Sequence, residues 1–323
     1  MSGSKPTRDG HASDANRYCD VAVLIPCFNE EKTVGKVVTD FSGALTGAKI
    51  LVFDNESSDN TAAVAQMNGA IVIRAPRRGK GNVVKQMFDQ VDAEAYITVD
   101  GDDTYPASAA SELLAEFRKG GVDMIVGVRE SSAQEHSYRR FHRFGNRLVA
   151  SLISRLFSVK LTDVMSGYRV LSREFVKSVP LKSKGFEVET EMTLQAVTKD
   201  FVIREVPIQY GSRPEGSYSK LNTFSDGFLV LKAIFIIFKD YKPLIFFSSL
   251  SFVLLIISSL TGFRAVRDYL ETGQVYHLPS AVLATGTMIL AALSLCIGLI
   301  LDTLSKYHNE NFQLLRRLVK KQQ

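Results

Sequence analysis

The sequence predicts an α/β domain built on a mostly parallel sheet, followed by an amphipathic helix and two transmembrane helices. Through the first part of the 323 residues, short apolar runs alternate with stretches of helical periodicity. Such alternation is typical of a sheet that is covered by helices on both faces. Nearer the C-terminus, two apolar stretches without charge, 243–263 and 278–301, are each long enough to cross a bilayer as a helix.

Strands and helices follow one another along this first part of the chain. We expect strands over 21–26, 49–53, 70–74, 95–99, 123–128, 167–171 and 201–206. We expect helices over 30–45, from about 58 onward, and over 82–91, 108–119, 138–157 and 188–199. The run 210–221 is rich in Gly, Ser, Arg and Lys and is expected to be a loop.

The chain divides into segments of different composition. Residues 1–17 are polar and are expected to be a disordered leader, and 18–221 form the α/β domain. Residues 222–242 place apolar side chains at helical spacing, which indicates either a helix lying on the membrane surface or an ordinary surface helix of the domain. The two spans 243–263 and 278–301 follow, and 302–323 form a basic tail.

The basic residues predict the orientation of an integral membrane protein with two spans. They are concentrated before the first span and after the second, at Lys232, Lys239, Lys242, Lys306, Arg316, Arg317, Lys320 and Lys321. Because cytoplasmic flanks are enriched in Lys and Arg, we expect the α/β domain and both termini in the cytoplasm and the loop 264–277 outside. The three cysteines are too scattered for a disulfide framework or a zinc site, which fits a cytosol-facing domain.

The charge balance narrows the class of partner. The formal net charge of +5 does not point to nucleic acid, and we expect no nucleic-acid partner. A mild basic excess suits a lipid bilayer with anionic headgroups or a phosphorylated ligand.

Polar motifs follow four of the expected strands, at 26–31, 54–59, 77–81 and 100–103. The carboxyl ends of parallel strands lie at one edge of a sheet, where α/β proteins bind their ligands. We therefore expect the four motifs to form one shared site.

Asp100 and Asp102 are separated by Gly101 and come directly after a buried strand. Carboxylates at i and i+2 can face one hard cation from the same side, and Mg²⁺ or Mn²⁺ bound in this way keeps positions open for phosphate. The alternative is an ordinary turn, in which Asp-Gly pairs are frequent. The polar motifs at the neighbouring strand ends favour the metal site.

Gly79, Lys80 and Gly81 lie in the run Arg-Arg-Gly-Lys-Gly, just before an expected helix. Glycine lets the backbone approach a phosphate closely, and a helix N-terminus attracts an anion. The run lacks the spacing of a P-loop. No Gly-x-Gly-x-x-Gly follows the first strand, so a dinucleotide-binding fold is not expected.

An ordered set of motifs resembles glycosyltransferase family 2, which has the GT-A fold. The set comprises IPCFNEE (25–31), DNESSDNT (54–61), RRGKG (77–81), DGDDTYP (100–106), MSGYRVLSR (165–173) and RPEGSYSK (213–220). The last two motifs and the two spans resemble the polyprenyl-phosphate branch, which includes dolichyl-phosphate mannose synthase and its bacterial relatives. The resemblance covers about residues 20–301.

For the donor, the resemblance implies a nucleotide site whose base and ribose are held by Pro26, Phe28, Glu30 and Asp54, with Asn55 nearby. It also implies a divalent cation, Mg²⁺ or Mn²⁺, held on the diphosphate by Asp100 and Asp102, with Gly101 between them at the nucleotide-sugar. Relatives often carry a Gln at the position of Thr104, so the resemblance supplies no third protein ligand.

For the acceptor, the resemblance implies that Arg129 and Arg143 grip a phosphate and that a loop with Arg213 and Lys220 closes over the phosphates. The implied reaction transfers a sugar from a UDP-sugar, or from GDP-mannose as the second choice, to undecaprenyl or dolichyl phosphate. A phosphate monoester has a second pKa of about 6 and needs no general base at neutral pH. Attack opposite the leaving group inverts the anomeric carbon. The sequence leaves the oligomeric state open, a homo-oligomer included.

Other interpretations are weighed against this one. A processive polysaccharide synthase would need a Gln-x-x-Arg-Trp motif, and the chain has no tryptophan. A sugar nucleotidylyltransferase would carry its Gly-rich loop after the first strand, where this chain has Pro-Cys-Phe-Asn-Glu. A family 2 enzyme with a non-lipid acceptor and a non-enzymatic membrane scaffold stay open. It also stays open whether Glu189 lines the sugar pocket or faces water, and whether Arg169 binds a carboxylate within the fold.

Overall fold

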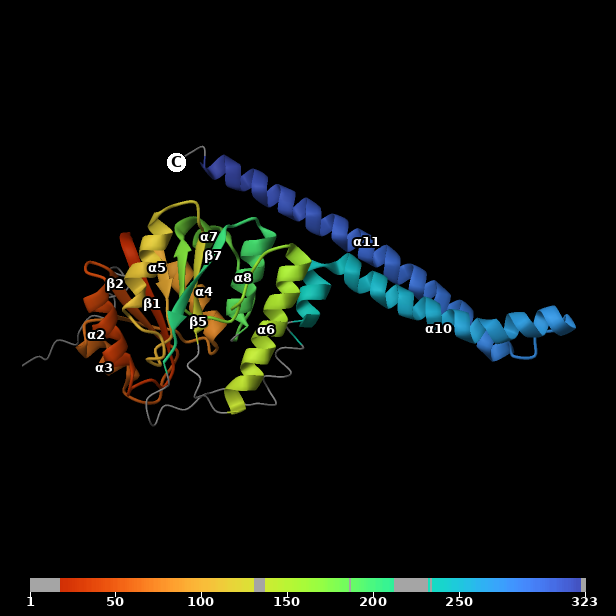
Figure 1. Ribbon diagram of the computed structural model, residues 1–323, viewed down its shortest axis with the longest axis horizontal. Helices are drawn as coiled ribbons and strands as arrows, with labels where there is room; N and C mark the ends of the chain where they lie inside the picture. Colours follow the sequence, from red (N-terminus) through yellow and green to blue (C-terminus); the bar gives the residue numbers. More distant parts are fainter. Residues whose placement is uncertain (1–17, 131–136, 186, 212–231, 233, 321–323) are drawn as a thin grey trace, which may run out of the picture. The chain divides into compact units, whose positions relative to one another are not determined.

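The computed structural model of the protein describes residues 18–130, 137–185, 187–211, 232 and 234–320 (Figure 1). The chain forms two compact units, Met1–Leu231 and Lys232–Gln323. The first unit contains the sheet and the second contains two long helices.

The first unit is built on a seven-stranded sheet in the order β3-β2-β1-β4-β6-β5-β7. Its strands are β1 (Cys19–Cys27), β2 (Lys49–Asp54), β3 (Ile71–Arg74), β4 (Ala93–Thr98), β5 (Met124–Glu130), β6 (Arg169–Ser172) and β7 (Ile203–Gln209). All pairings are parallel except those of β6, which runs antiparallel to β4 and β5. The mostly parallel sheet expected from the sequence is confirmed.

The reversal of β6 was not foreseen from the sequence, and it shapes the site. Because β6 runs against its neighbours, its first residue, Arg169, pairs with Thr98, the last residue of β4, and with Val126 of β5. The segment before β6, which contains the motif Met-Ser-Gly-Tyr-Arg, is thereby brought to the edge where the polar motif after β4 begins.

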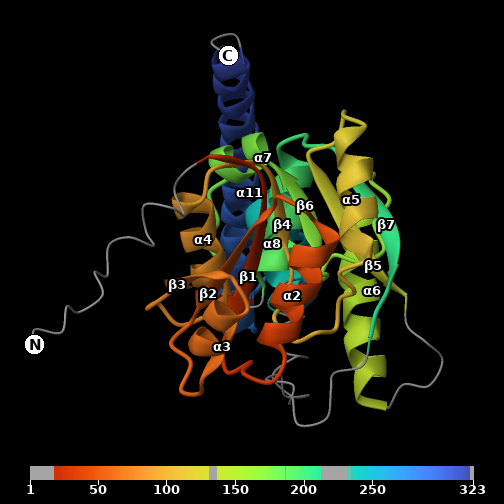
Figure 2. The same ribbon diagram turned by 90° about the vertical axis from the view of Figure 1, so that its left-hand side faces the viewer.

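Helices cover both faces of the sheet (Figure 2). On one face, α2 (Val34–Ala44) packs against α3 (Thr61–Met67) and α5 (Ala109–Arg118). On the other, α4 (Lys80–Gln90) packs against α7 (Arg173–Ser178) and α8 (Val188–Thr198), and α6 (Ser137–Phe157) packs against α8. The short helix α7 was not expected. It begins at a Ser172 cap, whose hydroxyl oxygen accepts a hydrogen bond from the Phe175 amide at 3.0 Å.

The central strand β1 is buried on both faces. Its odd-numbered residues from Val21 to Cys27 belong to one core cluster with Phe41 of α2 and Leu113 of α5. Ala22 and Leu24, which lie between them, are fully buried as well. A strand covered on both sides reads as one continuous apolar run, which is why the sequence located it well. Its packing anchors the strand end from which the first polar motif leaves.

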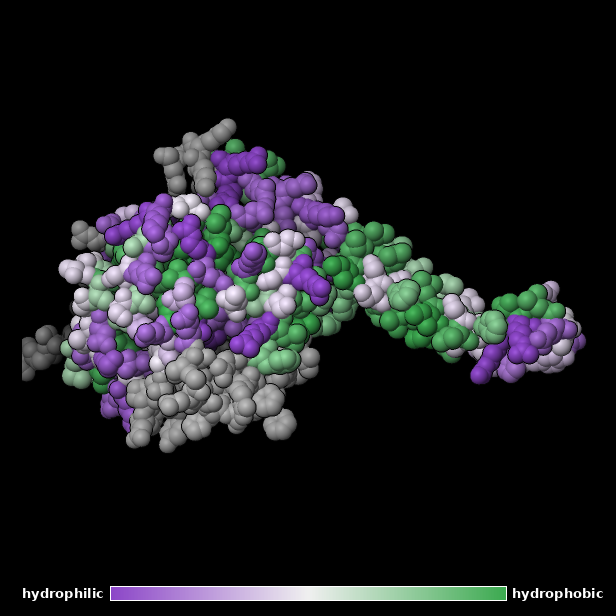
Figure 3. Space-filling view, viewed as in Figure 1, coloured by the Kyte–Doolittle hydropathy of each residue, from purple (hydrophilic) through white to green (hydrophobic). Residues whose placement is uncertain are grey.

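The second unit is a pair of long helices, α10 (Pro243–Thr272) and α11 (Leu278–Lys320), preceded by the short π-helix η1 (Ile237–Tyr241). Both are long and apolar enough to cross a membrane, and apolar side chains cover much of the pair (Figure 3). Each helix begins where its span was expected to begin. However, α10 continues past 263 and α11 past 301, so most of the expected loop 264–277 and tail 302–323 is helical. Of the amphipathic helix expected over 222–242, residues 222–231 and 233 lie outside the described part.

Small residues fill the seam between α10 and α11. Ser251 Oγ donates to the Ala291 carbonyl and Ser258 Oγ to the Ala284 carbonyl, both at 2.8 Å. Hydroxyl groups that are satisfied across a helix pair need no water, which is the arrangement that a lipid environment favours.

Candidate active site

The loops after β1 and β2 contact each other at the carboxyl edge of the sheet. The Glu30 amide donates to Thr61 Oγ1 at 2.8 Å. The Arg78 guanidinium, from the loop after β3, lies 4.6 Å from the centre of the Phe28 ring. The structure therefore brings the first three motifs together. The residues expected to hold the nucleotide base and ribose come from this region: Pro26, Phe28, Glu30 and Asp54.

Asn55 holds this part of the site together from inside. It is 6% exposed, and its Nδ2 donates to the carbonyls of Ala75 and Arg77 at 2.7 and 2.8 Å. Its Oδ1 accepts from the Gly79 amide at 2.9 Å. The Asn55 amide group, which was expected near the nucleotide, therefore fixes the loop after β3 to the end of β2.

The two glycines of the Arg-Arg-Gly-Lys-Gly run make room for the protein's own backbone. A Cβ on Gly79 would lie 2.2 Å from the Lys184 carbonyl oxygen, and one on Gly81 would lie 2.3 Å from the Ser183 carbonyl oxygen. Gly79 also has φ +109°, a conformation that favours glycine. The sequence assigned this close approach to a phosphate, and the structure shows that residues 183–184 occupy it. Glu191 of α8 holds that segment through the Ser183 amide at 2.7 Å.

Lys80 bridges two carboxylates inside the site. Its Nζ lies 2.5 Å from Asp100 Oδ1 and 2.5 Å from Glu189 Oε1. Burial alone would lower the pKa of Lys80, but the charges of Asp100 and Glu189 outweigh burial and raise it above its usual value. Glu189 is 4% exposed, and burial, together with the charge of Asp100, raises the pKa of Glu189 more than Lys80 lowers it. Glu189 therefore belongs to this buried cluster and does not face water.

Asp100 and Asp102 lie in the turn after β4. Asp102 is 3% exposed, and its Oδ1 accepts from Thr104 Oγ1 at 2.6 Å. The described residues contain no group of three or more His, Cys, Asp or Glu side chains that could hold a metal. Two carboxylates are, however, what Mg²⁺ or Mn²⁺ commonly takes from a protein when phosphate and water complete its ligands. The pair fits a cation that binds together with a diphosphate.

Close packing fixes the turn that carries these two aspartates. A Cβ on Gly101 would lie 2.5 Å from Cys27 Sγ, and one on Gly167 would lie 2.8 Å from Asp100 Oδ2. Thr33 Oγ1 donates to the Gly101 carbonyl at 2.6 Å. Gly101, which was expected at the nucleotide-sugar, therefore lets the turn pack directly on the end of β1.

Of the four basic residues expected to hold phosphates, Arg129 is the one whose side chain is described. It lies near the end of β5, where its Nε and Nη2 are 2.8 and 3.0 Å from the two Asp163 carboxylate oxygens. Arg143 lies in α6, and its side chain is outside the described part of the chain. Arg213 and Lys220 are also outside it.

Arg169 supports the fold from within. It is fully buried, and it donates to the carbonyls of Ser166 and Val164 and to Thr193 Oγ1 at 2.8 to 2.9 Å. Its hydrogen-bond acceptors are thus carbonyls, a hydroxyl and the Met124 sulfur, and none of them is the carboxylate that the sequence analysis left open. Sequence reasoning also missed Asp163 as a site residue, although its place just before the Met-Ser-Gly-Tyr-Arg motif was a usable signal.

A hollow of about 690 Å³ lies beside the turn that carries the aspartates. Its wall includes Asp103 and Thr104 of that turn and, from the ends of β5 and β7, Glu130 and Gln209. None of the described residues that were expected to bind substrate lines it.

Comparison with known proteins gives the same family as the sequence motifs. Residues 22–179 match Glycosyl transferase family 2. Glycosyltransferase AglJ of Haloferax volcanii is 28% identical over 302 residues, which are 92% of this chain and 98% of that protein. Dolichyl-phosphate hexose transferase of the same organism is 29% identical over 217 residues, which are 67% of this chain and 93% of that protein.

The solved structures agree on the fold. Glucosyl-3-phosphoglycerate synthase of Mycobacterium tuberculosis, in complex with Mn²⁺, UDP and glucosyl-3-phosphoglycerate, matches with a TM-score of 0.57 and 19% identity. The match covers 74% of this chain and 86% of that chain. The sheet and the edge that carries the motifs define a GT-A glycosyltransferase fold. Residues 22–179 of the chain form a glycosyltransferase family 2 domain.

Proposed function

We propose that the protein transfers a hexose from a nucleotide-sugar to a polyprenyl phosphate at a membrane surface, with inversion of the anomeric carbon. A UDP-sugar is the expected donor and GDP-mannose the second choice, and undecaprenyl or dolichyl phosphate is the acceptor. One observation carries the proposal: Asp100 and Asp102 lie at the same sheet edge as Arg129, two strands away, in a chain with two helices long enough to cross a membrane.

The similar proteins support both substrates. One relative is named for the transfer of a hexose to dolichyl phosphate. A solved structure with the same fold holds Mn²⁺ and UDP, which supports a UDP-sugar donor and a divalent cation here.

On the donor side, Asp100 and Asp102 would hold Mg²⁺ or Mn²⁺, which supplies positive charge to the leaving diphosphate. Lys80 adds a second positive charge beside Asp100, and its two carboxylate contacts keep it in place. A fixed charge in a buried site stabilises developing negative charge without having to reorganise. Lys80 therefore acts on the diphosphate from the protein side.

On the acceptor side, the phosphate brings its own nucleophile. It is mostly a dianion at neutral pH, so one of its oxygens bonds to the anomeric carbon without losing a proton. The bond from that carbon to the diphosphate breaks, and the nucleoside diphosphate leaves with the electron pair. The protein has to bind and orient two anions, and Arg129, whose guanidinium is always charged, would hold the acceptor. Arg143, Arg213 and Lys220 are proposed to complete the contacts with the phosphates.

The proposal includes an orientation in the membrane. The basic residues that flank α10 and α11 support an orientation with the sheet unit and both chain ends in the cytoplasm. The connection between the two helices, residues 273–277, would then lie on the opposite side.

The test is a donor and acceptor panel with membranes that contain the protein. Labelled UDP-sugars and GDP-mannose are each offered polyprenyl phosphate, polyprenol without phosphate, and soluble 3-phosphoglycerate. The expected result is labelled lipid with polyprenyl phosphate and one donor, and none with the Asp102→Asn variant. Transfer to 3-phosphoglycerate without lipid labelling would show a non-lipid acceptor. Absence of both transfer and donor hydrolysis would favour a scaffold.

A further inference from the structure

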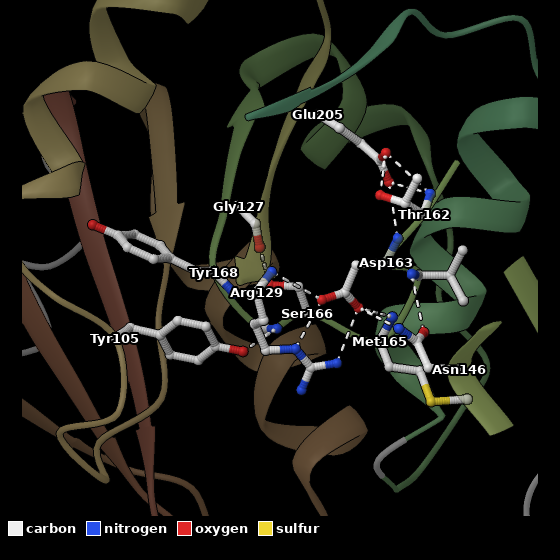
Figure 4. A network of polar contacts seen from close by, with 12 residues as sticks. Tyr105, Gly127, Arg129, Asn146, Thr162, Asp163, Met165, Ser166, Tyr168 and Glu205 are labelled. Carbon is white, nitrogen blue, oxygen red and sulfur yellow. Dashed lines mark hydrogen bonds and ion pairs between the residues drawn. The ribbon is translucent and has the colours of Figure 1, made fainter. Parts of the chain in front are cut away.

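Asp163 lies at the centre of a polar network around Arg129 (Figure 4). It is 4% exposed, and its two oxygens accept from Arg129 Nε at 2.8 Å and Nη2 at 3.0 Å. Two parallel charge-assisted hydrogen bonds fix the plane of a guanidinium as well as its position. Burial alone would raise the pKa of Asp163, but Arg129 and the backbone amides outweigh burial and hold it below its usual value. The carboxylate therefore stays charged.

Asp163 is itself held from three directions. Asn146 of α6 donates through Nδ2 to Asp163 Oδ1 at 3.0 Å, and the Met165 amide donates to the same oxygen at 3.1 Å. The Asp163 amide donates to Glu205 of β7 at 3.0 Å. Asn146 and Glu205 lie 17 and 42 residues from Asp163 in the sequence. Asn146 and the Met165 amide hold the carboxylate, whereas Glu205 holds the backbone amide. The orientation of the carboxylate is thus set by the tertiary structure before any substrate binds.

The contact with Asp163 leaves one nitrogen of Arg129 for a ligand. Nε and Nη2 both point to Asp163, whereas Nη1 points away from it and makes no hydrogen bond to a described residue (Figure 4). The guanidinium carbon also lies 5.6 Å from the centre of the Tyr210 ring. The guanidinium is thus held along one edge by Asp163 and lies over the Tyr210 ring with one face.

We infer that Asp163 is a positioning residue that fixes Arg129 so that Nη1 is the group that contacts the acceptor phosphate. The inference rests on the proposed function, in which Arg129 binds that phosphate. The same carboxylate also ties down α6 through Asn146.

This role predicts a particular kinetic signature. Asp163 balances the charge of Arg129, so the pair orients the phosphate more than it attracts it. In Asp163→Asn, the arginine regains its full charge but loses its fixed direction. We expect kcat to fall by about 10- to 100-fold, as for a small misplacement of a reacting group. We expect the KM for polyprenyl phosphate to stay level or fall.

The decisive experiment is a double-mutant cycle on the full-length protein in membranes. Lipid turnover is measured for Asp163→Asn, Arg129→Ala and the double variant, and nucleotide binding is measured calorimetrically for all three. If Asp163 acts through Arg129, the double variant turns over no more slowly than Arg129→Ala, and nucleotide affinity stays level throughout. If the Asp163→Asn loss persists in full in the Arg129→Ala background, the inference is overturned.

Glu205→Gln is the matched control. Glu205 holds the same turn through the Thr162 and Asp163 amides at 2.8 and 3.0 Å, but it does not contact Arg129. Its effect should combine additively with Arg129→Ala. If Asp163→Asn does not fold, Asn146→Ala is taken through the same cycle, because Asn146 and Arg129 share Asp163 Oδ1. Non-additivity there supports the inference, and additivity overturns it.

The same cycle distinguishes a failure of the inference about Asp163 from a failure of the proposed function. Normal lipid turnover by Arg129→Ala would overturn the proposed acceptor site, and the inference with it. Impaired turnover by Arg129→Ala, combined with additive behaviour of Asp163→Asn, would leave the proposed function standing and overturn the inference alone.

Discussion

Replacing Lys80 with methionine should destabilise the sheet unit, and the loss should be larger at pH 8 than at pH 5.5. Methionine keeps the length of the side chain but removes the ammonium that lies 2.5 Å from both Asp100 and Glu189. Glu189 is then a buried carboxylate without its cation.

The size of the effect follows from the geometry. Two unit charges 2.5 Å apart attract by about 6 to 7 kcal/mol at an effective dielectric constant of about 20. Desolvation offsets much of this, and removing one partner of a buried ion pair costs about 3–5 kcal/mol in practice. For a unit of this size, that corresponds to a fall in Tm of roughly 6–20 °C.

The pH dependence has a definite sign. Burial raises the pKa of Glu189 in the folded protein, and removing Lys80 raises it further. The folded variant then holds a proton that the unfolded chain releases, so its stability increases as the pH falls toward the unfolded pKa of about 4.3. The difference in unfolding free energy between the unmodified protein and the variant should therefore decrease by up to about 1.4 kcal/mol for each unit by which the pH is lowered. Lys80 itself does not titrate in this range, because its pKa is raised.

The assay is thermal unfolding followed by circular dichroism in detergent, because the chain has no tryptophan to report by fluorescence. Lys85→Met is the matched control. Lys85 lies in the same helix, is partly exposed and donates to a backbone carbonyl at 2.9 Å, so its loss should cost about 0.5 kcal/mol or less. A Lys80→Met variant as stable as Lys85→Met, or a deficit that does not change with pH, would refute the reasoning.

Three further predictions address the metal site, the packing and the orientation. Asp102→Asn should weaken Mn²⁺ binding in the presence of UDP by at least about tenfold, measured by electron paramagnetic resonance; unchanged binding would remove Asp102 from the metal site. Gly81→Ala should lower stability in thermal unfolding by about 1–3 kcal/mol, because its Cβ would meet a backbone carbonyl oxygen at 2.3 Å, whereas Gly43→Ala has nothing within 4 Å and should be neutral or stabilising. In a cysteine-free background, Gln274→Cys should react with an impermeant maleimide in intact cells, and labelling of Gln323→Cys instead would reverse the orientation.

The outline of the fold could be predicted because it depends on local patterns of apolar residues in the sequence. Buried parallel strands such as β1 read as continuous apolar runs, and the two long apolar stretches read as helices from their composition alone. The C-terminal ends of the two long helices could not be predicted from the sequence in the same way. α10 and α11 continue as helices beyond their apolar cores, because helical structure does not have to stop where hydrophobicity does.

The type and order of residues along the chain were enough to predict the fold class, the family and the edge of the sheet where polar motifs gather. Which groups face one another depends instead on how the elements pack in three dimensions. This packing places Glu189 against Lys80, residue 183 against Gly81, and Asp163 against Arg129. These pairs are 109, 102 and 34 residues apart. They depend on the reversal of β6 and on helix packing across the sheet, which no local periodicity encodes.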